Sequence, residues 1–121
     1  MTISDSIAML SDMIFQKFKK KIESIKKRIY ALGDLRPGTL YTRYSVCGKS
    51  GCKCTRSKNP VKHGPYYNLS YTFQGKSHTE FIRHEEVKRI EEEIRNYEKL
   101  MKLVKELIDC SIQLSRYRKE K

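Results

Sequence analysis

Two long segments, one near each end of the chain, place apolar residues at intervals of three and four. The first runs from about Ser4 to Leu32 and the second from about Glu85 to Tyr117. This spacing puts the apolar side chains on one face of an α-helix, whereas a half-buried strand needs strict alternation. Each segment is therefore predicted to form one long amphipathic helix that packs its apolar face on another element.

The residues between these segments follow a different pattern, rich in β-branched and aromatic residues and interrupted by Gly and Pro. Strands are predicted at 39–46, 66–73 and 76–82, with Gln74 and Gly75 joining the last two in a hairpin. The centre of the chain is therefore expected to form a small antiparallel sheet.

Three of the four cysteines fall within eight positions, at Cys47, Cys52 and Cys54, directly after the first predicted strand. A glycine-containing turn lets several thiols point inward, and the neighbouring basic residues favour the thiolate form that a metal ion requires. The N-terminal residues lack the basic and then apolar pattern of a secretion signal, so we expect a cytoplasmic protein. In that compartment, clustered cysteines favour metal over disulfides, and the sequence predicts a structural zinc site.

A tetrahedral zinc site needs a fourth ligand, and His63, nine residues after Cys54, is the first choice. His78 and His84 are alternatives, as are a ligand from a second chain and a site with no fourth protein ligand. Cys110 stands apart in the second predicted helix and is expected to be an ordinary buried thiol.

These patterns together predict an α+β protein that forms one compact domain. Its parts are an N-terminal amphipathic helix (1–34), a basic zinc-binding β module with a zinc-pinned turn (35–84) and a C-terminal amphipathic helix (85–121). Helices of about thirty residues are too long for so small a module to cover. We therefore expect an antiparallel helix pair whose remaining apolar surface forms a homodimer.

The charge of the chain is strongly positive, with 26 Lys and Arg against 14 Asp and Glu, a net +12. Residues 36–84 hold nine of these bases and one acid, Glu80, so most of the excess lies on the β module. Such a surface attracts polyanions, and we expect nucleic acid, DNA rather than RNA. The residues expected to contact it are Arg36, Arg43, Lys49, Lys53, Arg56, Lys58, Lys62 and Lys76.

Tyrosines are frequent in the predicted strands and could stack on bases or form the apolar face of the sheet. Alternation puts Tyr67, Leu69 and Tyr71 on one face, opposite Tyr66 and Asn68. One of these faces is expected to belong to the core.

The strings Leu35-Arg-Pro-Gly-Thr-Leu40, CGKSGCKC (47–54) and HGPYYNLSY (63–71) resemble a small prokaryotic family. That family is a domain of unknown function with RxGSL, CGKxxCxC and HGPYY motifs, loosely associated with mobile elements. The resemblance covers about residues 33–118 and implies no activity. It implies that Cys47, Cys52, Cys54 and His63 act as a unit.

The sequence therefore predicts a small nucleic-acid-binding protein, such as an accessory of a mobile element, with a zinc-stabilised helical scaffold or protein-interaction module as the alternative. No membrane partner is expected, because each helix mixes acids with its bases. No enzyme activity and no small-molecule substrate are expected either. The β module contains one carboxylate, no glycine-rich phosphate loop, and no grouping of nucleophile and base.

Overall fold

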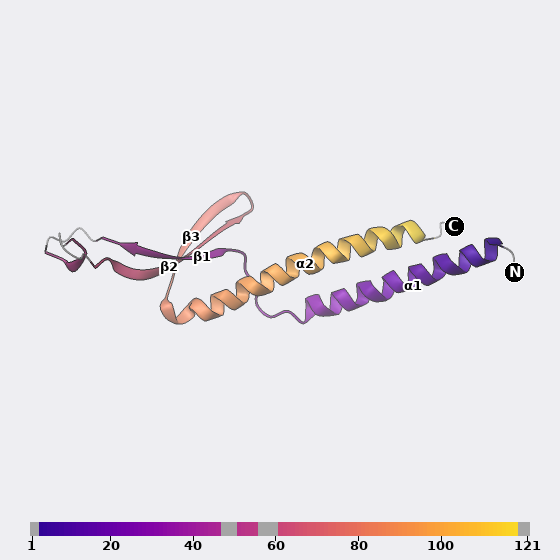
Figure 1. The fold of residues 1–121 in the computed structure, drawn as a ribbon, viewed down its shortest axis with the longest axis horizontal. Helices are drawn as coiled ribbons and strands as arrows, with labels where there is room; N and C mark the ends of the chain where they lie inside the picture. Colours follow the sequence, from indigo (N-terminus) through magenta and orange to yellow (C-terminus); the bar gives the residue numbers. More distant parts are fainter. Residues whose placement is uncertain (1–2, 47–50, 56–60, 119–121) are drawn as a thin grey trace. The chain divides into compact units, whose positions relative to one another are not determined.

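The structure, a computed structural model, describes residues 3–46, 51–55 and 61–118. Within these residues the helices, 3-10 helices (η) and strands follow one another as α1 (Ile3–Tyr30), β1 (Thr39–Ser45), η1 (Lys53–Thr55), β2 (His63–Phe73), β3 (Lys76–Ile82), η2 (His84–Glu86) and α2 (Val87–Tyr117) (Figure 1). The α+β fold predicted from the sequence is confirmed. None of the described helices combines the length and the apolar character needed to cross a membrane.

The chain divides into two compact units, and α2 contributes to both. Residues 1–33 and 98–121 form a helical unit, and residues 34–97 form a sheet unit that includes the first turns of α2. The sheet unit contains all the described cysteines except Cys110.

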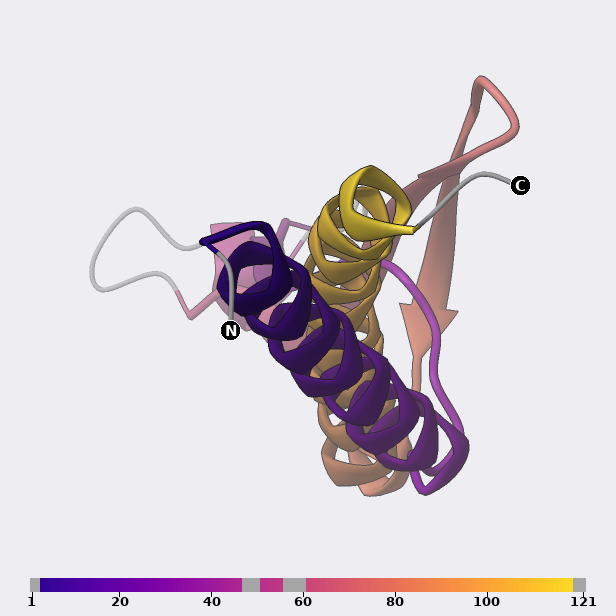
Figure 2. The same ribbon diagram turned by 90° about the vertical axis from the view of Figure 1, so that its right-hand side faces the viewer.

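In the helical unit, α1 and the C-terminal part of α2 run side by side in opposite directions (Figures 1 and 2). Ile22 and Ile25 of α1 and Leu103 and Cys110 of α2 form its buried core. Cys110 is 2% exposed, as expected of a buried thiol. The predicted packing of the two apolar stripes is confirmed, because three-and-four spacing places these residues on facing sides of the helices.

In the sheet unit, the strands form one antiparallel sheet in the order β1-β2-β3. The predicted hairpin connects β2 to β3, and its turn residues Gln74 and Gly75 have φ angles of 51° and 76°. Positive φ at both turn positions matches the right-handed twist of the flanking strands.

Strand β2 begins at His63, three residues before the predicted start. Its ladder with β1 continues past Arg43, through a bulge, to a final pair between Ser45 and His63. Gly and Pro at positions 64 and 65 suggested a loop before the strand. The pairing with β1 outweighs that local preference.

The first turns of α2 cover one face of the sheet, which we call the inner face. Leu69, Ile82 and Ile90 are buried there, and Tyr67 and Tyr71 pack beside them. The other side of the sheet is the outer face. As the alternation of β2 requires, it includes Tyr66, Asn68 and Ser70.

Candidate metal centre and basic surface

Three of the predicted zinc ligands meet in space. The sulfur atoms of Cys52 and Cys54 and a ring nitrogen of His63 all lie within 4.8 Å of one another. The Sγ atom of Cys52 is 3.1 Å from Nε2 of His63. Cys54 is 3% exposed, so the cluster is partly sheltered from water. These residues can hold a metal ion.

Local backbone structure brings the three side chains together. Cys54 lies in η1, and the amide of Val61 donates a hydrogen bond of 2.9 Å to the carbonyl of Lys53. That bond holds both arms of the β1–β2 connection close to each other. His63 opens β2 beside Ser45, so the metal cluster lies where the two strands enter their connection.

The two alternative histidines lie elsewhere in the sheet unit. His78 stacks on Tyr71 with ring centroids 4.9 Å apart, and His84 packs on Tyr67 at 5.6 Å. Among the described residues, His63 is the histidine that joins the cysteine cluster. Cys47, the remaining predicted ligand, lies outside the described residues.

The spacing of the ligand atoms suits a small tetrahedral ion. Zinc bonds of about 2.3 Å to sulfur and about 2.0 Å to nitrogen put neighbouring ligand atoms roughly 3.5 Å apart. The distances in the cluster, from 3.1 Å up to 4.8 Å, bracket this value. Two thiolates and an imidazole are borderline-soft donors, which zinc binds well.

Gly64, next to His63, is a position that the sequence reading missed. Its φ is +134°, and a Cβ atom there would lie 2.9 Å from the carbonyl oxygen of Arg43. The close approach of the two strands at the metal cluster therefore requires glycine.

Replacing Gly64 with Ala should push β2 away from β1 beside His63 and weaken metal binding. A competition titration with a chromophoric chelator measures the change, which we expect to be about tenfold or more. Gly51→Ala is the matched control, because Gly51 also has a positive φ, 81°, but open space around it. Equal losses in both variants would show that backbone strain, and not the strand contact, matters.

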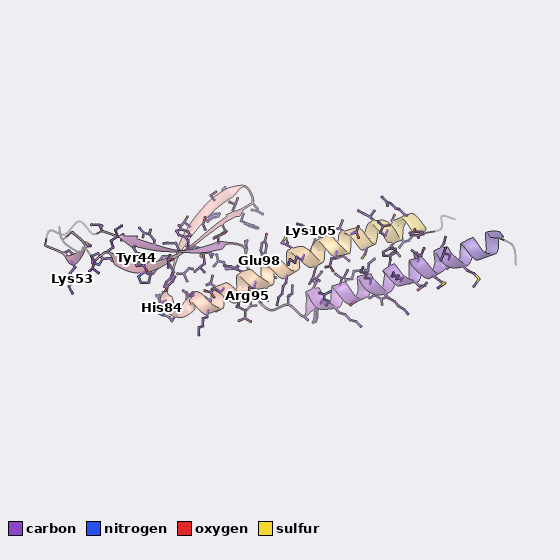
Figure 3. All side chains as sticks on the ribbon, viewed as in Figure 1. Tyr44, Lys53, His84, Arg95, Glu98 and Lys105 are labelled. Carbon is purple, nitrogen blue, oxygen red and sulfur yellow. The ribbon has the colours of Figure 1, made fainter. Side chains whose placement is uncertain are left out.

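The structure distributes the predicted nucleic-acid contacts over two ends of the sheet. Arg43, Lys53 and Lys62 lie toward the metal cluster, and Figure 3 shows Lys53 beyond the strand ends. Lys76 pairs with Phe73 at the hairpin end, about 30 Å away along β2. Lys49, Arg56 and Lys58 lie outside the described residues.

Arg36 has a partner within the chain. Its guanidinium forms an ion pair of 3.1 Å with Glu80 and lies 5.1 Å from the centre of the Tyr71 ring. The hydroxyl of Tyr71 donates a hydrogen bond of 3.0 Å to the same carboxylate. That bond is the main cause of a raised pKa of Tyr71. The contacts tie Arg36 to the inner face and give it a structural role.

Acidic and basic residues separate within the sheet unit. Glu86 and Glu93 lie on the helical side, where both pair with Arg89. Within the described residues, Arg43, Lys53 and Lys62 form no ion pair and no side-chain hydrogen bond. All three are exposed. We call the end of the sheet next to Cys52, Cys54 and His63 the metal end. It therefore presents cations that remain available to a polyanion.

The fold and the cluster together define a small α+β protein with a Cys/His cluster that could hold a metal ion at the end of a three-stranded sheet. A family model described as a domain of unknown function (DUF6788) matches residues 15–95. The match covers more than half of the 121 residues, and the chain belongs to this family. No curated protein and no solved structure matches the chain significantly.

Proposed function

We propose that the metal ion is zinc and that its role is structural. Two thiolates and an imidazole support this choice, and Cys47 is the fourth ligand proposed from the sequence. The ion would join η1 to the first residue of β2 and so fix the β1–β2 connection. A small sheet unit gains stability from such a cross-link, because its hydrophobic core is thin.

On this scaffold we propose nucleic-acid binding as the function. The supporting observation is a group of exposed cations: Arg43, Lys53 and Lys62 lie toward the metal end, whereas Glu86 and Glu93 pair with Arg89 on the helical side. Exposed cations bind phosphates without a sequence preference. The resemblance of its motifs supports an accessory role for a mobile element, with DNA as the polymer.

Binding of fluorescent oligonucleotides to the zinc-loaded protein tests this function. At low salt the protein should bind nucleic acid, and the affinity should fall steeply as salt rises. Absence of binding to duplex DNA, single strands and structured RNA would favour the scaffold function instead.

We further propose that the helical unit forms a homodimer. Phe18 stacks on Tyr117, the last residue of α2, with ring centroids 6.4 Å apart. The part of α1 before Phe18 therefore extends past its partner helix, and Leu10 and Met13 are 58% and 67% exposed there. A second copy related by two-fold symmetry gives each overhang an identical surface to pack on.

Met13→Glu should convert this dimer to a monomer, because the dimer would bury the new carboxylate. Sedimentation velocity across micromolar concentrations measures the change. Tyr30→Glu is the control, since Tyr30 is 92% exposed at the other end of α1. Salt should strengthen the dimer, because residues 1–33 and 98–121 carry fourteen bases and seven acids per copy. A wild-type protein that remains monomeric at high salt would contradict the proposal.

A further inference from the structure

The outer face of the sheet carries aromatic side chains that are exposed among the described residues. By register, Tyr41 of β1, Asn68 of β2 and Phe81 of β3 form one row across this face. Tyr41 is 41% exposed and Phe81 is 63% exposed. An isolated apolar residue on a surface needs no explanation, but a group of rings on one open face does.

The rings of this face contact one another and a cation. Tyr66 lies 6.5 Å from Phe81, centroid to centroid, at an interplanar angle of 57°. The guanidinium of Arg43, the cross-strand partner of Tyr66, lies 5.8 Å from the centre of the Tyr66 ring. A phosphate-binding group is thus held against a ring that can stack on a base.

Asn68 provides an independent observation. It is 7% exposed, and its amide nitrogen has no hydrogen-bond partner among the described residues. A buried donor without a partner is unfavourable, because it has lost its hydrogen bond to water. Base edges carry carbonyl and ring-nitrogen acceptors, which can accept a hydrogen bond from this amide once the neighbouring rings move apart.

The outer face also lacks negative charge. The residues that share it by alternation with Tyr66 and Asn68 include no acid, and its one charged residue is Arg43. The strand residues on the outer face are Thr39, Tyr41, Arg43, Tyr66, Asn68, Ser70, Thr72, Ser77, Thr79 and Phe81. An apolar protein partner would leave Arg43 unpaired, whereas a nucleic-acid strand supplies both flat bases and phosphates.

We propose that this outer face is a stacking platform for the unpaired bases of a single strand. Tyr41, Tyr66 and Phe81 are its stacking rings, Asn68 contacts a base edge and Arg43 contacts the backbone. The proposal rests on the proposed nucleic-acid binding and names its substrate. A duplex is a poorer substrate, because its bases already stack on one another and turn only their edges outward.

The metal cluster supports this platform directly. His63 lies three residues before Tyr66 on β2, and Ser45 lies two residues after Arg43 on β1. An ion held by His63 would fix the start of β2, and the Ser45–His63 pair would pass that restraint to β1 beside Arg43. The cations at the metal end, Lys53 and Lys62, extend the phosphate-binding surface beyond the rings.

The test uses the full-length, zinc-loaded protein and three fluorescent probes of about 20 nucleotides. These are an oligothymidylate, an abasic strand with the same phosphates, and a dA·dT duplex. We expect the oligothymidylate to bind about tenfold more tightly than the abasic strand, and more tightly than the duplex at the same salt. Phe81→Leu should weaken oligothymidylate binding about tenfold and leave binding of the abasic strand unchanged. Phe81→Tyr should keep the wild-type affinity for the oligothymidylate, because tyrosine retains an aromatic ring.

Phe73→Leu is the matched control. Phe73 is 59% exposed, much like Phe81, but alternation assigns it to the inner face at the hairpin end. It should not change binding of any probe. Because Phe81 is exposed, both leucine variants should keep full zinc content and a cooperative thermal transition.

The outcomes separate this inference from the proposed function. Equal affinity for the oligothymidylate and the abasic strand, or equal losses in Phe81→Leu and Phe73→Leu, would overturn the platform and leave nucleic-acid binding standing. No binding of the wild-type protein to any of the three probes would overturn both. If Phe81→Leu weakens oligothymidylate binding and Phe73→Leu does not, the result would support both the stacking platform and nucleic-acid binding.

Discussion

Cys52→Ser should strip the protein of zinc and unfold the β1–β2 connection. Cys52 lies 3.1 Å from His63 in the cluster, and a serine hydroxyl does not replace a thiolate as a zinc ligand. The binding energy of a structural zinc ion is folding energy, because the site does not exist in the unfolded chain. We expect a loss of at least about 4 kcal/mol from the free energy of unfolding of the sheet unit.

Metal analysis of the purified protein and thermal unfolding measure the two effects. Cys110→Ser is the control for zinc content: the side chain is buried between the helices, and the variant should keep one zinc per chain. In the same way, His63→Asn should lose the metal and His78→Asn should retain it.

Hydrogen exchange would locate the damage within the sheet unit. In Cys52→Ser, the amides near Ser45 and His63 should lose protection, because they flank the cluster. The core around Leu69 and Ile90 should lose less, since it packs on α2 and not on the metal. A metal-free protein that keeps its full stability and its protection at Ser45 would contradict the structural role of zinc.

Much of the fold could be predicted from local patterns. The apolar stripe of the first segment determines which face of α1 packs on α2, because helical periodicity alone assigns Ile22 and Ile25 to one face. Gly75 marks the hairpin, because glycine adopts a positive φ without steric cost. The cysteine spacing indicated the metal cluster, and the nearby histidine was assigned to it from its distance along the chain.

The rest depends on the register between strands, which no single segment of sequence contains. Phe81 became a candidate only when pairing placed it in one row with Asn68 and Tyr41. In the sequence it is one apolar residue in a short strand. Arg36 shows the opposite case, a residue that the sequence made a candidate and the structure explains by a partner within the chain. It counts as one more cation until Glu80, forty-four residues away, is found to pair with it.

Neutralising Lys49, Lys53 and Arg56 together should change the salt dependence of binding far more than an equal loss of charge elsewhere. Each phosphate contacted by a cation releases counterions, so log affinity falls with log salt by about 0.9 per contact on duplex DNA and about 0.7 on a single strand. With about four to six contacts, the slope should be about −4 to −5 on duplex and about −3 to −4 on a single strand.

The triple variant should reduce the size of that slope by about two to three on duplex. The control removes three exposed bases from α2, Lys99, Lys102 and Lys105 (Lys105 is labelled in Figure 3), which leaves the same net charge. If phosphates bind at the metal end of the sheet unit, the control changes the affinity slightly and the slope hardly at all. Equal changes of the slope in both variants would mean that net charge alone attracts nucleic acid. The metal end would then not be the binding surface.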